Sequence, residues 1–208
     1  MAGCCDDKSC EVEALRGRQS STLKAVLVIN ASMFVVELTA GLIAGSVALI
    51  ADSLDMLGDA LVYGFSLYVI ARGMRMKAVA AMFKGAIMAA FGLFVLGQAV
   101  YKIIVPEVPV FEAIGAVGLL ALAANALCLA LLWRHRGDDI NMKSVWLCSR
   151  NDIIANVSVL FAAAGVWLTG SGWPDILIGL AIALLFLRTA FSVLREAAQE
   201  YHQASQPR

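Results

Sequence analysis

Long apolar stretches, separated by short clusters of charged and turn-forming residues, dominate this chain. Most stretches are apolar on every side, so helical periodicity does not separate them, and the charge clusters and turn residues mark their ends. Each stretch is long enough for a helix that crosses a bilayer, which needs about 20 residues. The pattern therefore predicts an all-α bundle of six transmembrane helices, at Leu23–Ala44, Val47–Ile70, Ala78–Ile104, Val110–Leu132, Val145–Thr169 and Ile176–Leu194.

Lysine and arginine are distributed unevenly among the predicted loops. They precede the first span, follow the second, fourth and sixth spans, and are nearly absent from the other loops, where only Lys102 lies close by. Because positively charged loops stay on the cytoplasmic side, both termini are expected in the cytoplasm. The chain then divides into a cytoplasmic cysteine-containing tail (1–22), a six-helix transmembrane domain (23–195) and a short cytoplasmic tail (196–208).

Composition agrees with a membrane protein. Of 208 residues, 61% are hydrophobic and only 15% charged, with a mean hydropathy of +0.80, whereas soluble domains are nearer half apolar and a quarter charged. The formal net charge is zero, so the basic excess that nucleic-acid binding needs is missing. The polar N-terminal segment does not resemble a secretory signal peptide. We therefore expect an integral, multi-pass membrane protein in a lipid bilayer, with no nucleic-acid partner.

Three aspartates interrupt the second predicted span. Asp52, Asp55 and Asp59 follow one another at i, i+3 and i+7, which places them on one narrow stripe of a helix. An aspartate at the centre of a membrane helix costs about 2.5–3.5 kcal/mol, so three without partners would cost about 8–10 kcal/mol. A cation or protons must offset this cost, which indicates an ion-handling protein.

A second polar cluster opens the fifth predicted span. Cys148 and Asp152 lie four residues apart on one helical face, and Asn156 continues that face. If this face meets Asp55 and Asp59, four donors converge, the number that a tetrahedral divalent site requires. A thiolate among carboxylates favours zinc, cadmium or cobalt over magnesium or calcium, so we hypothesise a site for these softer ions.

The same crowding predicts proton coupling. Desolvation and like-charge repulsion both disfavour the ionised form of neighbouring carboxyl groups, so an empty site is expected to bind protons. Entry of a metal ion would then expel them. A site that binds either metal or protons and is exposed alternately to each side is sufficient for an antiporter.

These residues carry a family resemblance. The run Ala51–Asp59 resembles the second-helix signature of the cation diffusion facilitators, in which a His or Asp is followed four residues later by Asp. Asn125 lies where their fourth helix commonly has an asparagine, and Ile140–Asp152 resembles the segment entering their fifth helix, which carries a second such pair. The resemblance covers the chain from about Leu23 to Glu196. It implies an exporter of zinc, cadmium or cobalt from the cytoplasm rather than an enzyme. The resemblance further implies that the protein has no resident cofactor and lies in the inner membrane of a bacterium.

By this resemblance the metal ligands are Asp55, Asp59 and Asp152, with Cys148 at the position that is usually His or Asp. Cys148 is either a ligand that favours softer metals or a small bystander beside three carboxylates. Family members usually continue into a cytoplasmic metallochaperone-like domain after the sixth helix. The chain is expected to be a short member without that domain, forming a homodimer through its transmembrane helices.

Other interpretations of the polar residues stay open. Asp59 and Asp152 could form the dyad of an intramembrane aspartyl protease, or the protein could be a non-transporting metal sensor. Buried aspartates could also pair with Arg150 for purely structural reasons, and Asp52 has a supporting role beside the metal. Four further polar residues either line an ion path or make contacts between helices: Asn30, Glu37, Asn125 and Asn156.

The N-terminal segment contains three cysteines and two aspartates within seven positions, Cys4 to Cys10. Their spacing does not match a structural zinc site, and the flanking residues are polar enough for a disordered segment. The segment is either a weak metal-capture tail or incidental.

Overall fold

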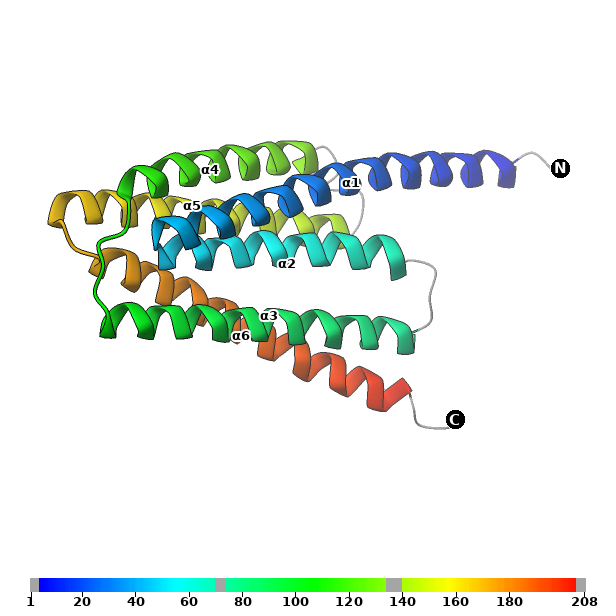
Figure 1. Ribbon diagram of the computed structural model, residues 1–208. Coiled ribbons are helices and arrows are strands. Elements are labelled where there is room, and N and C mark those ends of the chain that lie inside the picture. The colour runs from blue at the N-terminus through cyan, green and yellow to red at the C-terminus, as the bar shows by residue number, and fades with distance from the viewer. Residues whose placement is uncertain (1–3, 70–73, 134–139, 205–208) are drawn as a thin grey trace.

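The computed structural model describes the backbone of residues 4–69, 74–133 and 140–204, and the side chains of residues 21–61, 64, 79, 82, 83, 85–133, 152–195 and 197–199. Consecutive helices run antiparallel, so the two chain ends lie at the same end of the bundle (Figure 1). We call the opposite end the outer end. The described residues form six helices: α1 (Cys4–Ala44), α2 (Val47–Val69), α3 (Met74–Ile104), α4 (Phe111–Trp133), α5 (Ile140–Thr169) and α6 (Trp173–Ala204).

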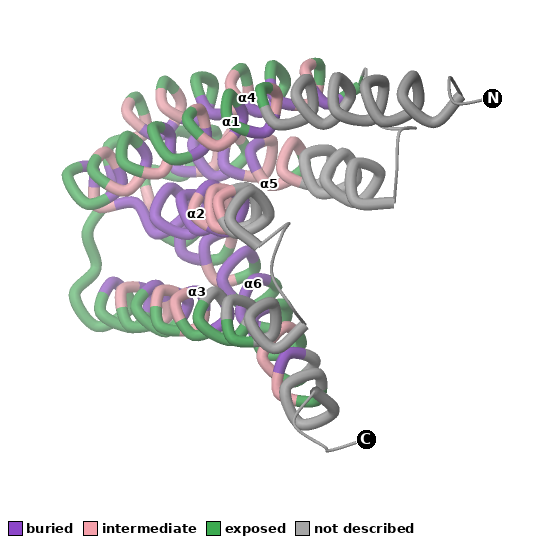
Figure 2. The backbone as a smooth tube through the Cα atoms, turned by 90° about the vertical axis from the view of Figure 1, so that its right-hand side faces the viewer, coloured by how far each residue is buried: buried purple, intermediate pink, exposed green. Residues whose placement is uncertain are grey.

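The helices are arranged around α2. Helices α1, α2, α4 and α5 pack together, α3 and α6 pack against each other beside them, and α2 contacts both groups. Figure 2 shows α3 at the lower edge of the bundle and α6 running from beside α2 and α5 down toward the C-terminus, with buried positions gathered between the helices. Every residue from Ser46 to Leu54 is buried, and Ala183 and Phe186 of α6 belong to the same apolar core. The aspartates of α2 therefore lie on the most enclosed helix.

The prediction of an all-α, six-helix membrane bundle is confirmed. Among the described residues, five helical segments are long and apolar enough to cross a membrane: 21–44, 85–104, 111–133, 152–169 and 173–199. The remaining helix, α2, carries the three aspartates. Large apolar side chains such as Leu119, Phe161 and Leu185 are exposed on the outside of the bundle. Such a surface suits lipid rather than water, so the chain is a multi-pass integral membrane protein.

The helices end close to their predicted boundaries at the outer end of the bundle. At the other end they extend beyond the predicted spans. Ala44, Ile104 and Thr169 end their helices at the predicted positions, whereas α1 begins at Cys4. The expectation of a disordered N-terminal segment is therefore wrong. Hydropathy delimits the part of a helix that lies in lipid, but a helix continues into water where the residues favour it. The segment Glu11–Gln19 contains many good helix formers, among them Glu, Ala, Leu, Arg and Gln.

A hydrogen-bonded junction closes the turn between α1 and α2. Gly45 adopts a φ of 69°, a left-handed conformation that suits glycine, and Ser46 caps α2 by accepting a bond from the Leu49 N–H at 3.1 Å. The carboxylate of Asp175, near the start of α6, accepts bonds from Ser46 Oγ at 2.5 Å, Val47 N at 2.6 Å and Ala48 N at 3.2 Å. The junction therefore fixes the start of α2 to the start of α6.

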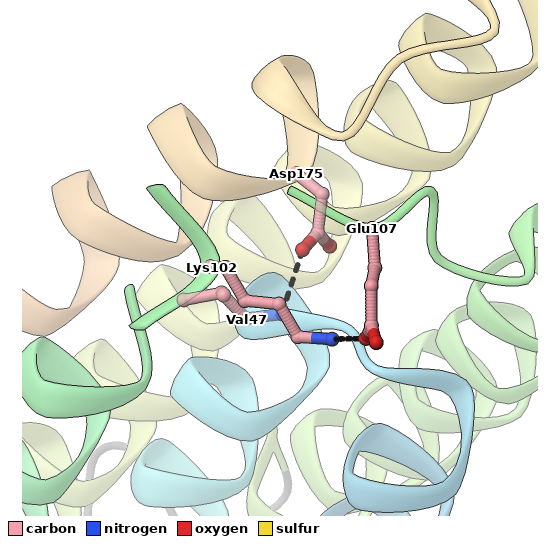
Figure 3. A network of polar contacts seen from close by, with 4 residues as sticks. All are labelled: Val47, Lys102, Glu107 and Asp175. Atoms are coloured by element: carbon pink, nitrogen blue, oxygen red, sulfur yellow. Dashed lines mark hydrogen bonds and ion pairs between the residues drawn. The ribbon is translucent and has the colours of Figure 1, made fainter. Parts of the chain in front are cut away.

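The same junction includes the end of α3. Figure 3 shows Lys102 reaching across the turn toward Glu107, with which it forms an ion pair at 2.5 Å, while Asp175 bonds to Val47 nearby. Helices α2 and α6 also approach closely here, because a Cβ placed on Gly179 would lie 2.6 Å from Val47 Cγ1 and 2.7 Å from its backbone carbon. At the outer end α2 and α6 are thus held together directly, and Lys102 of α3 interacts electrostatically with Asp175.

Candidate metal centre

The aspartates of α2 lie inside the bundle. Asp52 is completely buried, Asp59 is 9% exposed and Asp55 is half-buried. A helix that places three carboxyl groups on its inner stripe must meet polar groups on a neighbouring helix, since lipid offers none. Helix α5 contacts α2 and supplies such groups.

Helices α2 and α5 meet in an antiparallel register. Asn156 Nδ2 donates to Asp52 Oδ2 at 2.8 Å, and the carboxyl groups of Asp59 and Asp152 are hydrogen-bonded to each other. Helices α2 and α5 therefore face each other through aspartates that the sequence analysis proposed as candidates.

Electrostatic coupling joins the remaining carboxylate to this pair. Asp55 interacts electrostatically with Asp52 and Asp59, and Asp152 interacts with all three aspartates of α2. The three predicted carboxylate ligands, Asp55, Asp59 and Asp152, thus share one buried region between α2 and α5.

The described side chains do not form a compact metal cage. Among them, no three His, Cys, Asp or Glu residues lie close enough together to hold a metal ion. Cys148 belongs to α5, but its side chain lies outside the described residues, as do those of Arg150 and of the N-terminal cysteines Cys4, Cys5 and Cys10. The four-donor site of Asp55, Asp59, Asp152 and Cys148 therefore stays a prediction.

Asparagine side chains connect the aspartates to the surrounding helices. Asn125 Nδ2 on α4 donates to Asn156 Oδ1 on α5 at 2.9 Å, and Asn156 in turn donates to Asp52. On α1, Asn30 Nδ2 donates to the Val26 carbonyl at 2.9 Å and reaches Cys128 Sγ on α4 at 3.7 Å. These three asparagines make contacts between helices, one of the two roles left open for them.

Glu37 is one of the four polar residues whose role the sequence left open. It is 0% exposed, and neither carboxyl oxygen has a hydrogen-bond partner. Seven positions after Asn30, it lies two turns along the same face of α1. That spacing was the one signal in the sequence that could have marked it, and it does not by itself point toward α2.

The profile of the cation efflux transmembrane domain matches residues 23–200 of this chain. The chain belongs to the cation efflux family. Members of this family are transporters, so the alternative of an intramembrane aspartyl protease is wrong, although Asp59 and Asp152 do pair.

Curated bacterial relatives are similar over most of the chain. The metal cation efflux system protein CzcD of Cupriavidus metallidurans is 25% identical over 195 residues, which cover 87% of this chain and 61% of that protein. The zinc transporter ZitB of Yersinia pestis is 24% identical, with coverage of 88% and 64%. The cadmium, cobalt and zinc/H(+)-K(+) antiporter of Bacillus subtilis is 24% identical, with coverage of 84% and 62%. The matched region spans about three fifths of each relative.

Proposed function

We propose that this protein exports zinc-like divalent ions, meaning Zn²⁺, Cd²⁺ or Co²⁺, from the cytoplasm in exchange for protons. The ion binds between α2 and α5, at Asp55, Asp59, Asp152 and Cys148. The observation that carries the proposal is the pairing of Asp59 with Asp152 between the two helices, in a chain that matches the cation efflux transmembrane domain.

The chemistry of the site supports the exchange. A divalent cation among three carboxylates would displace the protons that these groups bind when the site is empty, because ligands bind metal in the deprotonated form. The relatives CzcD, ZitB and the antiporter of Bacillus subtilis support zinc, cadmium and cobalt as candidate ions. The proposed location is the inner membrane of a bacterium, with the exposed apolar helix faces available for a homodimer.

Purified protein in proteoliposomes should move zinc or cadmium across the bilayer when a proton gradient is imposed. Metal uptake should be accompanied by proton movement in the opposite direction, and a proton ionophore should abolish the gradient-driven part. A metal-sensitive dye inside the vesicles and a pH dye report both movements. Metal binding without flux would show a metal sensor instead of a transporter.

Replacing Cys148 by serine separates the two roles considered for this residue. A thiolate ligand contributes more to the binding of the softer ion, so the Cys148→Ser variant should lose more affinity for cadmium than for zinc. Calorimetric titration of both metals into both proteins measures the difference. An equal loss, or none, would show that Cys148 is not a ligand.

A further inference from the structure

Arg188 places a positive charge on the outside of an apolar helix. It belongs to the segment of α6 that is long and apolar enough to cross a membrane, 173–199, and its side chain is exposed. The exposed residues one turn before it, Leu184 and Leu185, are apolar. A charged side chain in such a place is costly in lipid and calls for a functional explanation.

The packing of α3 against α6 fixes the register of these two antiparallel helices (Figure 1). A Cβ placed on Gly92 would lie 2.5 Å from Leu187 Cδ2. Seven positions away on each helix, a Cβ placed on Gly85 would lie 2.8 Å from Leu194 Cγ, so the register is constant over this length. The apolar segment of α3 begins at Gly85. Arg195, which follows Leu194, therefore lies at the level of the membrane boundary.

Arg188 lies deeper in the membrane than Arg195, on the same exposed face of α6. The two residues are seven positions apart, which is two helical turns or about 10 Å along the axis. The hydrocarbon core is about 30 Å thick, so Arg188 lies within the leaflet on the side of the chain termini. The flexible stem of an arginine allows its guanidinium group to reach toward the headgroups of that leaflet.

The helices α3 and α6 offer these two arginines no counter-charge. Neither arginine has an Asp or Glu three or four positions away on α6, and the whole of α3, Met74–Ile104, contains no acidic residue. Neither arginine forms an ion pair with another side chain that the structure describes. The positive charge on this face therefore needs an anion from outside the protein.

We propose that Arg188 and Arg195 bind an anionic phospholipid in the leaflet on the side of the chain termini. The phosphate group lies between the two guanidinium groups, because arginine forms paired, charge-assisted hydrogen bonds with phosphate oxygens. The acyl chains extend toward the bilayer centre along Leu184 and Leu185. Both parts of a phospholipid thus find a match on one face of α6. The excess of lysine and arginine at this end predicts the cytoplasmic leaflet, which carries negative charge.

Lipid binding is measured on purified, delipidated full-length protein in an uncharged detergent. Short-chain phosphatidylglycerol should bind saturably and raise the thermal unfolding temperature, because a ligand of the folded state stabilises it. Phosphatidylcholine of the same chain length, whose headgroup has no net charge, should bind at least about tenfold more weakly. Glycerol phosphate without acyl chains should not bind at these concentrations. Native mass spectrometry counts the lipids bound to each chain.

Arg188→Gln and Arg195→Gln should each weaken phosphatidylglycerol binding at least about tenfold and reduce the stabilisation by this lipid. Using both variants keeps the test valid if one of them does not fold. Lys24→Gln is the matched control, since Lys24 is an exposed basic residue of α1 at the same end of the bundle. This control should bind phosphatidylglycerol as the unchanged protein does.

Three outcomes would overturn the lipid site. Phosphatidylglycerol that binds no more tightly than phosphatidylcholine would show that the arginines do not select an anion. An equal loss in Lys24→Gln and in both arginine variants would show attraction to general surface charge. Arginine variants that change the oligomeric state in gel filtration and leave lipid binding intact would show that this face contacts a second copy of the chain. Zinc titration should be unchanged in the arginine variants, so the lipid site and the proposed function are tested separately.

Discussion

Replacing Asp59 or Asp152 by asparagine should abolish zinc binding and metal transport while the protein stays folded. Asparagine has nearly the shape of aspartate and can keep the hydrogen bond between α2 and α5, but it provides no negative charge for the metal. Changes to residues that merely orient metal ligands cost about 10–100-fold in affinity, so loss of a direct ligand should exceed about 100-fold. Metal-dependent proton release should disappear with it, since a metal ion that does not bind displaces no protons from the site.

Calorimetric zinc titration in weakly buffered solution measures binding and proton release together. Circular dichroism and gel filtration establish that the variants are folded, and Glu112→Gln, a change to an exposed carboxylate in the first turn of α4, serves as the control. Asp55→Asn should resemble the other two variants, because Asp55 is electrostatically coupled to both aspartates on either side of it. Zinc affinity and proton release that survive in both Asp59→Asn and Asp152→Asn would refute the site.

Short-range patterns in the sequence are sufficient to predict the helices and the two faces that carry the aspartates. Gly45 and Gly170 mark the turns at which α1 and α5 end, and both adopt positive φ values. The i, i+3, i+7 spacing on α2 determines which carboxyl groups share a side of the helix, whatever that helix packs against. The meeting of α2 and α5 was a hypothesis from the sequence, and it agrees with the high cost of leaving either set of carboxyl groups in lipid.

The detailed pairing of the two helices depends on tertiary packing and could not be predicted. Spacing on a single helix cannot specify that Asp52 meets Asn156 while Asp59 meets Asp152, because several registers bury the same faces. The same holds for Glu37, whose lack of a partner depends on how α1 is rotated against α2. The extension of α1 to Cys4 was missed for another reason, since hydropathy reports the lipid boundary and not the end of a helix.

Asp175 is a further residue that local sequence could not identify. It follows a Trp-Pro pair at the start of a helix, where an acidic residue commonly favours the helix dipole. In the fold it also binds the beginning of another helix, nearly 130 positions earlier in the chain. Its importance to the outer end of the bundle is therefore a property of the tertiary structure alone.

Replacing Asp175 by alanine should destabilise the protein by about 3–5 kcal/mol. A hydrogen bond to a charged group contributes about 1.5–3 kcal/mol, and the substitution removes three acceptor contacts, although their effects will not be fully additive. The substitution leaves three hydrogen-bond donors without an acceptor: Ser46 Oγ and the backbone N–H groups of Val47 and Ala48. All three residues are buried, so water cannot replace the lost carboxylate. Asp175→Asn, which keeps an acceptor oxygen, should lose roughly half as much stability.

Unfolding in mixed detergent micelles, followed by circular dichroism, measures these differences. Glu107→Gln is the matched control: Glu107 belongs to the same junction, but its side chain is 61% exposed, so loss of its ion pair with Lys102 should cost less than about 1 kcal/mol. An Asp175→Ala variant as stable as Glu107→Gln would show that α2 and α6 are held together by apolar packing alone. The larger loss expected for Asp175→Ala would instead make its carboxylate the main link between α6 and the helix that carries the metal-binding aspartates.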